Sequence, residues 1–175
     1  MISNKAASLA AINAGFPATA IPANTLHIAL FKGSKPDFNQ IFTLAHGAGW
    51  NVKAVTALGL TQANFLGSIA FAAMTPIVNP SARTLTLPFG GNAATLTGVA
   101  DGTPTYYVAR IVASGGAGIA SWANFVLSSS PGTLLAGPAW MGTVGDQGSD
   151  AELQFIGGTI KTGQAYRFLD MTFQL

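Results

Sequence analysis

Short apolar segments with a period of two residues run along most of this chain, and turn residues separate them. The clearest is 104–113, where Tyr107 and Ala109 fall on one face of an extended strand and Tyr106 and Val108 on the other. A period of two is that of a β-strand, because successive side chains point to opposite faces. Similar segments occupy residues 26–31, 68–74, 84–87, 119–127, 139–144, 151–156 and 165–173. Gly, Ser, Asp and Pro fill the breaks, as turns require.

About eight short strands with few helices predict a mainly β fold, either an antiparallel β-sandwich or a jelly-roll-like body. The sequence shows no alternation of helices and strands of the kind that would indicate a parallel sheet. In the strand 26–31, Leu26, Ile28 and Leu30 share one face, so this strand is expected to be half buried. His27 falls on its other face, where we expect ordinary packing or a surface position. The segment 76–80, bracketed by prolines, is predicted to be a turn.

Residues 1–22 predict a short helical arm and a linker. Ser3 or Asn4 can cap the helix, and Leu9 and Ile12 are three apart on one face. Such a short helix is marginal alone because nucleation is costly, so it should dock on its own domain or on a neighbour. We expect the β domain to span residues 23–175. Its segment 37–66 is predicted to be an irregular insertion. The sequence pattern within it fits a helix and an irregular excursion equally well.

Charged residues are scarce for a chain of this length. Eight basic and six acidic residues make up 8% of the sequence, against about 25% in an average globular protein. Since 49% of the residues are hydrophobic, either neutral polar side chains cover the surface or other molecules cover part of it. The basic residues are scattered, which does not favour nucleic acid as a partner. No uncharged window is apolar enough to predict a membrane span.

Catalytic and cofactor motifs are absent from the sequence. There is no phosphate-binding loop and no Gly-x-Ser-x-Gly elbow, and the two histidines, His27 and His46, lack metal-ligand spacing. The absence of cysteine excludes a thiolate metal site and a disulfide framework. With so few ionisable groups the chain is not expected to be an enzyme or to need a cofactor.

Three of the six acidic residues, Asp146, Asp150 and Glu152, lie in one glycine-bearing segment. Oxygen ligands in such a turn can hold calcium, but the spacing does not match an EF-hand loop. The alternative is a turn in which Asp and Ser side chains bond nearby backbone N–H groups. The second interpretation is favoured, and the three carboxylates stay a weak metal candidate.

Three blocks of the sequence carry a resemblance. They are Gly102-Thr103-Pro104-Thr105-Tyr106-Tyr107-Val108-Ala109-Arg110-Ile111, then the run from Trp140 through Gly142-Thr143-Val144-Gly145 to Leu153, then Thr159-Ile160-Lys161-Thr162-Gly163-Gln164. Together with the upstream segment 26–36 behind a short helix, they make up about a quarter of the chain. This pattern resembles a group of small structural proteins of tailed bacteriophages. The chain departs from that group in the segments 37–65 and 115–138.

The resemblance implies a virion component that assembles in the host cytoplasm, with no catalytic residue carried over. We expect a capsid decoration or cement protein that contacts itself, as a homo-oligomer such as a trimer, and the major capsid protein. A tail, collar or fibre-associated protein is the alternative, and a receptor- or carbohydrate-binding module is the alternative of another class. Apolar residues in the arm and the two departing segments are the predicted interface residues. They are Leu9, Ile12, Phe16, Phe38, Ile41, Phe42, Trp50, Trp122 and Phe125.

Overall fold

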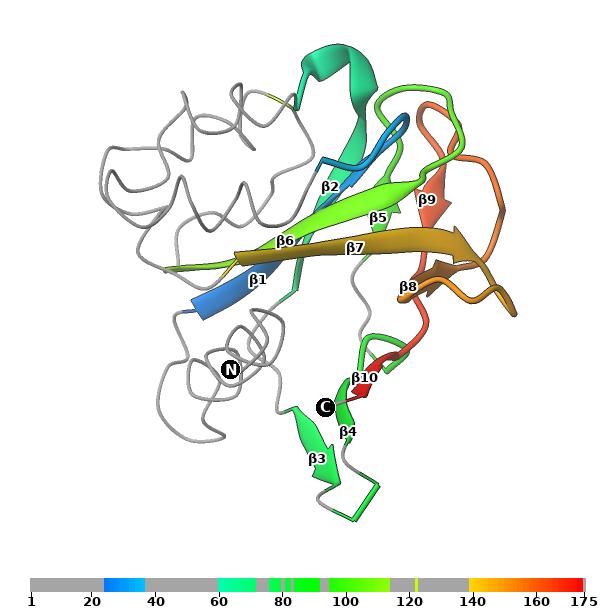
Figure 1. Ribbon diagram of the computed structural model, residues 1–175. Helices are drawn as coiled ribbons and strands as arrows, with labels where there is room; N and C mark the ends of the chain where they lie inside the picture. The colour runs from blue at the N-terminus through cyan, green and yellow to red at the C-terminus, as the bar shows by residue number, and fades with distance from the viewer. Residues whose placement is uncertain are drawn as a thin grey trace.

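The computed structural model describes residues 24–36, 60–71, 76–79, 81–82, 84–91, 95–113, 122 and 139–174, and within them the fold is mainly β (Figure 1). The strands are β1 (Asn24–Phe31), β2 (Phe65–Phe71), β3 (Ile77–Asn79), β4 (Thr84–Leu87), β5 (Leu96–Thr97), β6 (Tyr106–Ala113), β7 (Ala139–Asp146), β8 (Leu153–Phe155), β9 (Ala165–Tyr166) and β10 (Met171–Gln174). A 3₁₀ turn, η1 (Gln62–Asn64), leads into β2.

The largest sheet has five strands in the order β2-β1-β6-β7-β8. The first three pairs are antiparallel, and they include the full length of β1 against β6, from Asn24 opposite Ala113 to Phe31 opposite Tyr106. The pair β7–β8 is parallel. The prediction of a purely antiparallel body is therefore wrong at this edge, where residues 147–152 carry the chain back to begin β8 beside β7.

The strand β1 is buried on both faces, so the prediction of a half-buried strand is wrong. Leu26, Ile28 and Leu30 lie in the main core, as their spacing predicts. On the other face His27 and Phe31 are also fully buried. A nearly continuous apolar run is typical of a strand covered on both sides, and in Leu26–Phe31 only the histidine interrupts that run.

A β-bulge shapes the pairing of β1 with β2. Leu30 lies opposite Gly67 and Phe31 opposite Phe65, so Leu66 is the extra residue. The Leu66 carbonyl accepts a hydrogen bond from the Val99 N–H at 2.9 Å, which ties the segment before β6 to this edge. Gly67 has φ +150°, and a Cβ there would lie 2.9 Å from the Thr97 carbonyl oxygen. A glycine is therefore required where these two segments meet.

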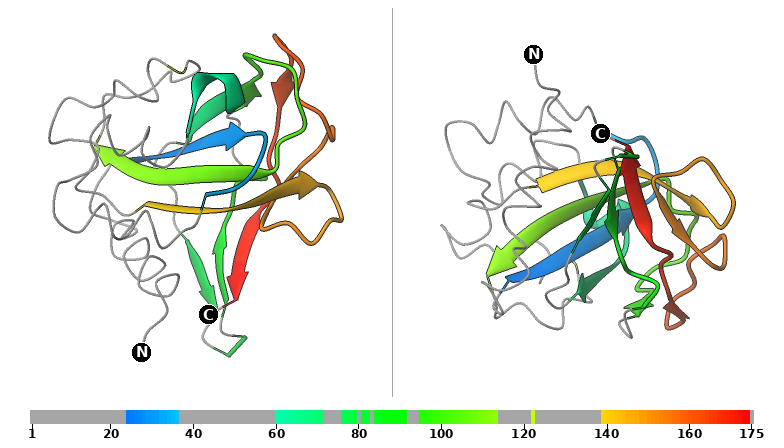
Figure 2. Two further views of the ribbon diagram at one scale, coloured as in Figure 1. Left: turned by 45° about the horizontal axis from the view of Figure 1, so that its top comes forward. Right: turned by 90° about the horizontal axis from the view of Figure 1, so that it is seen from below.

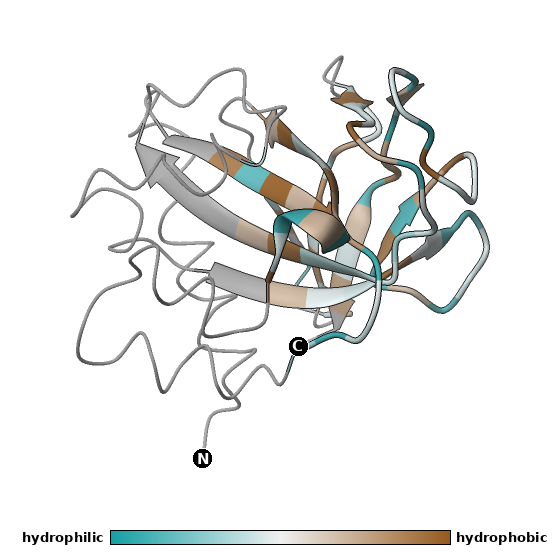
Figure 3. Ribbon diagram, turned by 90° about the horizontal axis from the view of Figure 1, so that it is seen from above, coloured by the Kyte–Doolittle hydropathy of each residue, from teal (hydrophilic) through white to brown (hydrophobic). Residues whose placement is uncertain are grey.

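The main core lies between one face of the five-stranded sheet and two smaller sheets, β10-β4-β3 and β5-β9. Figure 2 shows β4 and β10 running across the large sheet rather than along it. Leu85 and Leu87 of β4 and Met171 and Phe173 of β10 contribute buried side chains to this core. Apolar segments gather on the strands in Figure 3, as expected for elements that face a core.

Several predicted elements differ from the structure in extent. The segment 76–80 contains β3, paired with β4, rather than only a turn, because its prolines flank the paired residues instead of interrupting them. The predicted strand 165–173 divides into β9 and β10, which join different sheets. The helical arm 1–22, the insertion from 37 to 59 and the predicted strand 119–127 apart from Trp122 lie outside the described residues.

Candidate interaction surface

Most of the described charged side chains gather in loops at one end of the five-stranded sheet. The end of β1, the start of β6 and the end of β7 are adjacent because these strands are antiparallel (Figure 1). The loops there hold half of the chain's charged residues, namely Lys32, Lys35, Asp101, Asp146, Asp150, Glu152 and Lys161. We call this region the loop end.

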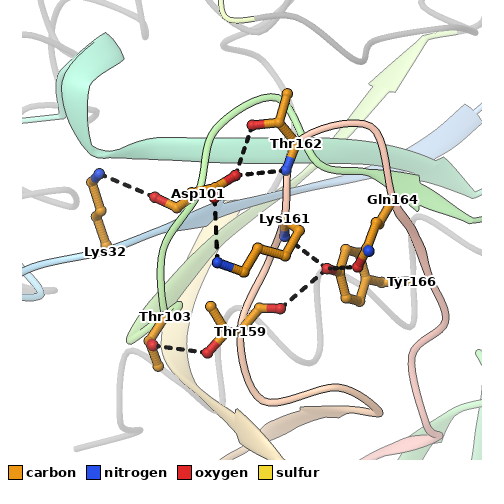
Figure 4. A network of polar contacts seen from close by, with 8 residues as sticks. All are labelled: Lys32, Asp101, Thr103, Thr159, Lys161, Thr162, Gln164 and Tyr166. Atoms are coloured by element: carbon orange, nitrogen blue, oxygen red, sulfur yellow. Dashed lines mark hydrogen bonds and ion pairs between the residues drawn. The ribbon is translucent and has the colours of Figure 1, made fainter.

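Asp101 joins two segments of the loop end that are distant in sequence (Figure 4). Its Oδ1 accepts hydrogen bonds from the Thr162 backbone N–H at 2.8 Å and the Thr162 hydroxyl at 2.9 Å, and its Oδ2 lies 3.3 Å from the Lys161 Nζ. The Thr162 bonds, with the Lys161 ammonium, lower the pKa of Asp101 below its ordinary value. Both ends of the ion pair are exposed, so Asp101 acts mainly by fixing the Thr162 backbone.

The first and third blocks of the resemblance meet at this clamp. The backbones of Gly102 and Ile160 exchange two hydrogen bonds, at 2.9 and 3.0 Å, and the hydroxyls of Thr103 and Thr159 are 3.3 Å apart. Behind them the Tyr166 hydroxyl accepts a hydrogen bond from the Lys161 N–H at 2.7 Å. The two blocks therefore form one folded unit.

The second block packs on the first through a glycine. Gly142 on β7 lies opposite Tyr107 on β6, and a Cβ at Gly142 would overlap the Glu152 carboxylate and approach the Tyr107 ring to 2.8 Å. The Tyr107 hydroxyl donates to Glu152 Oε2 at 3.3 Å. The Glu152 carboxylate thus reaches Tyr107 over the backbone of Gly142. A side chain at position 142 would block this contact, which explains why this block needs a glycine there.

The acidic segment forms the predicted turn, in which carboxylate oxygens bond backbone N–H groups. Asp146 Oδ1 accepts hydrogen bonds from the N–H groups of Gln147 at 3.0 Å and Gly157 at 3.3 Å. Gly148 takes φ +85° where the chain reverses, and Gln154 bonds both Gly148 and Ser149. Across the described part of the chain, no three His, Asp or Glu residues are placed to hold a metal ion.

An open groove of about 700 Å³ lies between the acidic turn and β10. Its lining includes the apolar residues Ala151, Leu169 and Phe173 and the carboxylates of Asp150, Glu152 and Asp170. Asp170 Oδ1 accepts a hydrogen bond from the Gly90 N–H at 2.6 Å, which joins β10 to the end of β4. Two of the three carboxylates therefore also hold the walls of the groove in place.

The second face of the large sheet carries an aromatic layer. Phe31 stacks on Tyr106 with ring centroids 5.2 Å apart, and Trp122 meets Phe31 and Phe65 edge-on at 6.4 and 5.6 Å. Burial raises the pKa of Tyr106 to about 12. Trp122, one of the predicted interface residues, is half buried against this layer.

The other predicted interface residues, Leu9, Ile12, Phe16, Phe38, Ile41, Phe42, Trp50 and Phe125, lie outside the described residues, as does His46. Within the described part, the large apolar side chains that remain exposed are Ile77, Val99 and Ile156. Asp101, Gln154 and Tyr166 were not singled out from the sequence. In the sequence, only the turn-forming residues around them indicated structure at these positions.

Comparisons with known proteins found no matching family model, no matching curated protein and no matching solved structure. No helix within the described ranges is long and apolar enough to cross a membrane.

Proposed function

We propose that this chain is a structural component of a bacteriophage virion, and that it acts as a capsid decoration or cement protein. The observation that carries the proposal is the three-block pattern in residues 102–111, 140–153 and 159–164. These blocks contact one another through Gly102–Ile160 and Gly142–Tyr107. They therefore form one structural unit, and this supports treating the three blocks as a single scaffold.

The placement of charge supports a role in protein–protein contact. Half of the charged residues lie in the loop end, whereas the strands β3, β4 and β10 carry none. Desolvating a charge is costly, so protein interfaces are poor in charge at their centres. In this proposal the loop end faces solvent or a neighbouring copy at its rim, and the uncharged surfaces face other virion proteins.

The mechanism is the removal of surface from water at repeated contacts. A protein interface of standard size buries about 1,600 Å² in total. A decoration protein repeats its contacts over a shell, and multivalent docking raises the overall affinity without new kinds of contact. The partners are further copies of the chain and the major capsid protein. The segments 1–22, 37–59 and 115–138, which hold all nine predicted interface residues, supply the particle-specific contacts.

The finer fold assignment belongs to the same proposal. The crossing of β4 and β10 over the large sheet resembles the second layer of a sandwich. Such a body would present a flat outer face to a shell, with the loops at its ends.

The test is the copy number of the chain in purified particles of the phage that encodes it, measured by quantitative mass spectrometry against the major capsid protein. Hundreds of copies support decoration, and a few copies support a tail, collar or fibre-associated role. Absence from the particles overturns the proposal. In that case specific binding on a glycan array would support the receptor- or carbohydrate-binding module.

A further inference from the structure

The groove beside β8 has the form of a docking site for a short loop. Ala151, Leu169 and Phe173 give it an apolar lining, and three carboxylates stand around them. Its walls are fixed by the Asp170–Gly90 hydrogen bond at 2.6 Å and by the Leu169 N–H, which donates to the Gln154 carbonyl at 2.9 Å. A groove with fixed walls does not need to reorganise when it is filled, which favours binding.

Charge decides what fits this groove. Three of the chain's six acidic residues line it, and no basic residue stands among its described lining. The chain has a net charge of +2, so the residues outside the groove carry +5. A basic segment of a second copy therefore has the charge that complements this site, and complementary charge steers association and sets its register.

The same chain carries a loop of the matching kind. Lys32-Gly33-Ser34-Lys35-Pro36 follows β1 and contains the only two basic residues that lie close together in the sequence. Its base is fixed, because the Thr105 hydroxyl donates to the Gly33 carbonyl and the Lys32 N–H donates to the Asn64 carbonyl at 2.9 Å. Lys35 in this loop is exposed.

The fold prevents the loop from filling the groove of its own molecule. The loop follows β1 and the groove borders β8, and β6 and β7 lie between these strands. Three strand spacings amount to about 14 Å, which is farther than a lysine side chain extends. The two features lie toward opposite lateral sides of the sheet, at the same loop end (Figure 1).

We propose that the groove lined by Asp150, Glu152 and Asp170 receives the loop 32–36 of a second copy, with Lys35 as the contacting cation. Because groove and loop are different surfaces, the contact is head-to-tail and closes into a ring when the rotation between copies allows it. This inference rests on the proposed function, since it names the contact that builds the homo-oligomer.

Charge reversal of two exposed residues tests the contact in the full-length protein. Asp150→Lys and Lys35→Glu each place like charges together, so each should weaken self-association about tenfold or more in sedimentation velocity. An equimolar mixture of the two variants should regain association, because each supplies the feature that the other has lost. The double variant D150K/K35E should regain it as well.

Matched controls separate the contact from a general effect of charge. Lys35→Arg keeps the cation and should associate as the wild type does. Arg167→Glu changes the net charge as K35E does but lies outside the loop, and it should also leave association unchanged. Circular dichroism of each variant checks that the fold is intact, and added salt should weaken the wild-type contact.

The proposal is overturned if D150K and K35E associate as tightly as the wild type, if the mixture does not regain association, or if R167E weakens it equally. A wild-type chain that stays monomeric at its highest soluble concentration also overturns it. None of these outcomes changes the copy number in particles, so the proposed function succeeds or fails separately.

Discussion

Replacing Trp122 with alanine should destabilise the folded chain itself, and not only an assembly of several copies. The indole meets Phe31 and Phe65 edge-on, with ring centroids 6.4 and 5.6 Å away. Each such aromatic pair contributes about 0.5–1.5 kcal/mol beyond its buried area. Full burial of a tryptophan would set the cost at about 3–5 kcal/mol, and the half-buried position of Trp122 reduces it. We expect a loss of about 2–3 kcal/mol of unfolding free energy.

The assay is thermal unfolding followed by far-ultraviolet circular dichroism at a protein concentration where the chain is monomeric. For a domain of this size about 2–4 °C of Tm accompanies each kcal/mol, so Trp122→Ala should lower Tm by roughly 4–12 °C. Trp122→Phe keeps a ring against Phe65 and should lose about 1 kcal/mol. If Trp122→Ala unfolds within 1 °C of the wild type, the residue does not stabilise the sheet and the packing argument is wrong.

Three further predictions follow from other contacts. Burial raises the pKa of Tyr106 to about 12, so its neutral form contributes stability below pH 10 that is lost as pH rises toward 12. Ultraviolet titration should show phenolate absorbance near pH 12, and Tyr106→Phe should remove that absorbance. The pKa of Asp101 lies below its ordinary 3.8, so the stability that the ionised carboxylate contributes is present above that pH and is lost as pH falls through the lowered value. Asp101→Asn should therefore flatten the acid side of the stability–pH curve, and an unchanged acid side would contradict the clamp. Gly142→Ala should cost about 1–3 kcal/mol in urea unfolding because its Cβ overlaps Glu152, and adding Glu152→Ala should recover part of that loss; strictly additive effects would refute the contact.

Local sequence patterns predicted those strands that polar or turn-forming residues flank in the sequence. The segment 84–87 is β4 without a shift of boundary, and the alternation of Tyr106 and Tyr107 on β6 places them on opposite faces, as predicted. Turn chemistry also predicted that Asp146 bonds nearby backbone N–H groups.

Pairing between distant segments could not be derived from these patterns. A period of two says that a strand has two faces, but it does not say that Phe31 on the second face is as buried as Leu30 on the first. Likewise, the Asp101–Thr162 clamp joins loops about sixty residues apart, and neither loop carries a sign of the other. Strand β3 was missed because flanking prolines are a strong turn signal, although they also suit a short edge strand.

The position of β1 inside the sheet, between β2 and β6, has a consequence for how the chain folds. One edge of β1 pairs with β2, but its other edge needs β6, which places Ala113 opposite Asn24. Because closing such a long loop is entropically costly, folding should be slow, on the order of milliseconds to seconds. During synthesis the apolar β1–β2 pair leaves the ribosome well before its partner and exposes an unpaired edge. A truncated chain that ends before β6 should therefore aggregate, and the full chain should fold most productively when synthesis is rapid or a chaperone covers that edge.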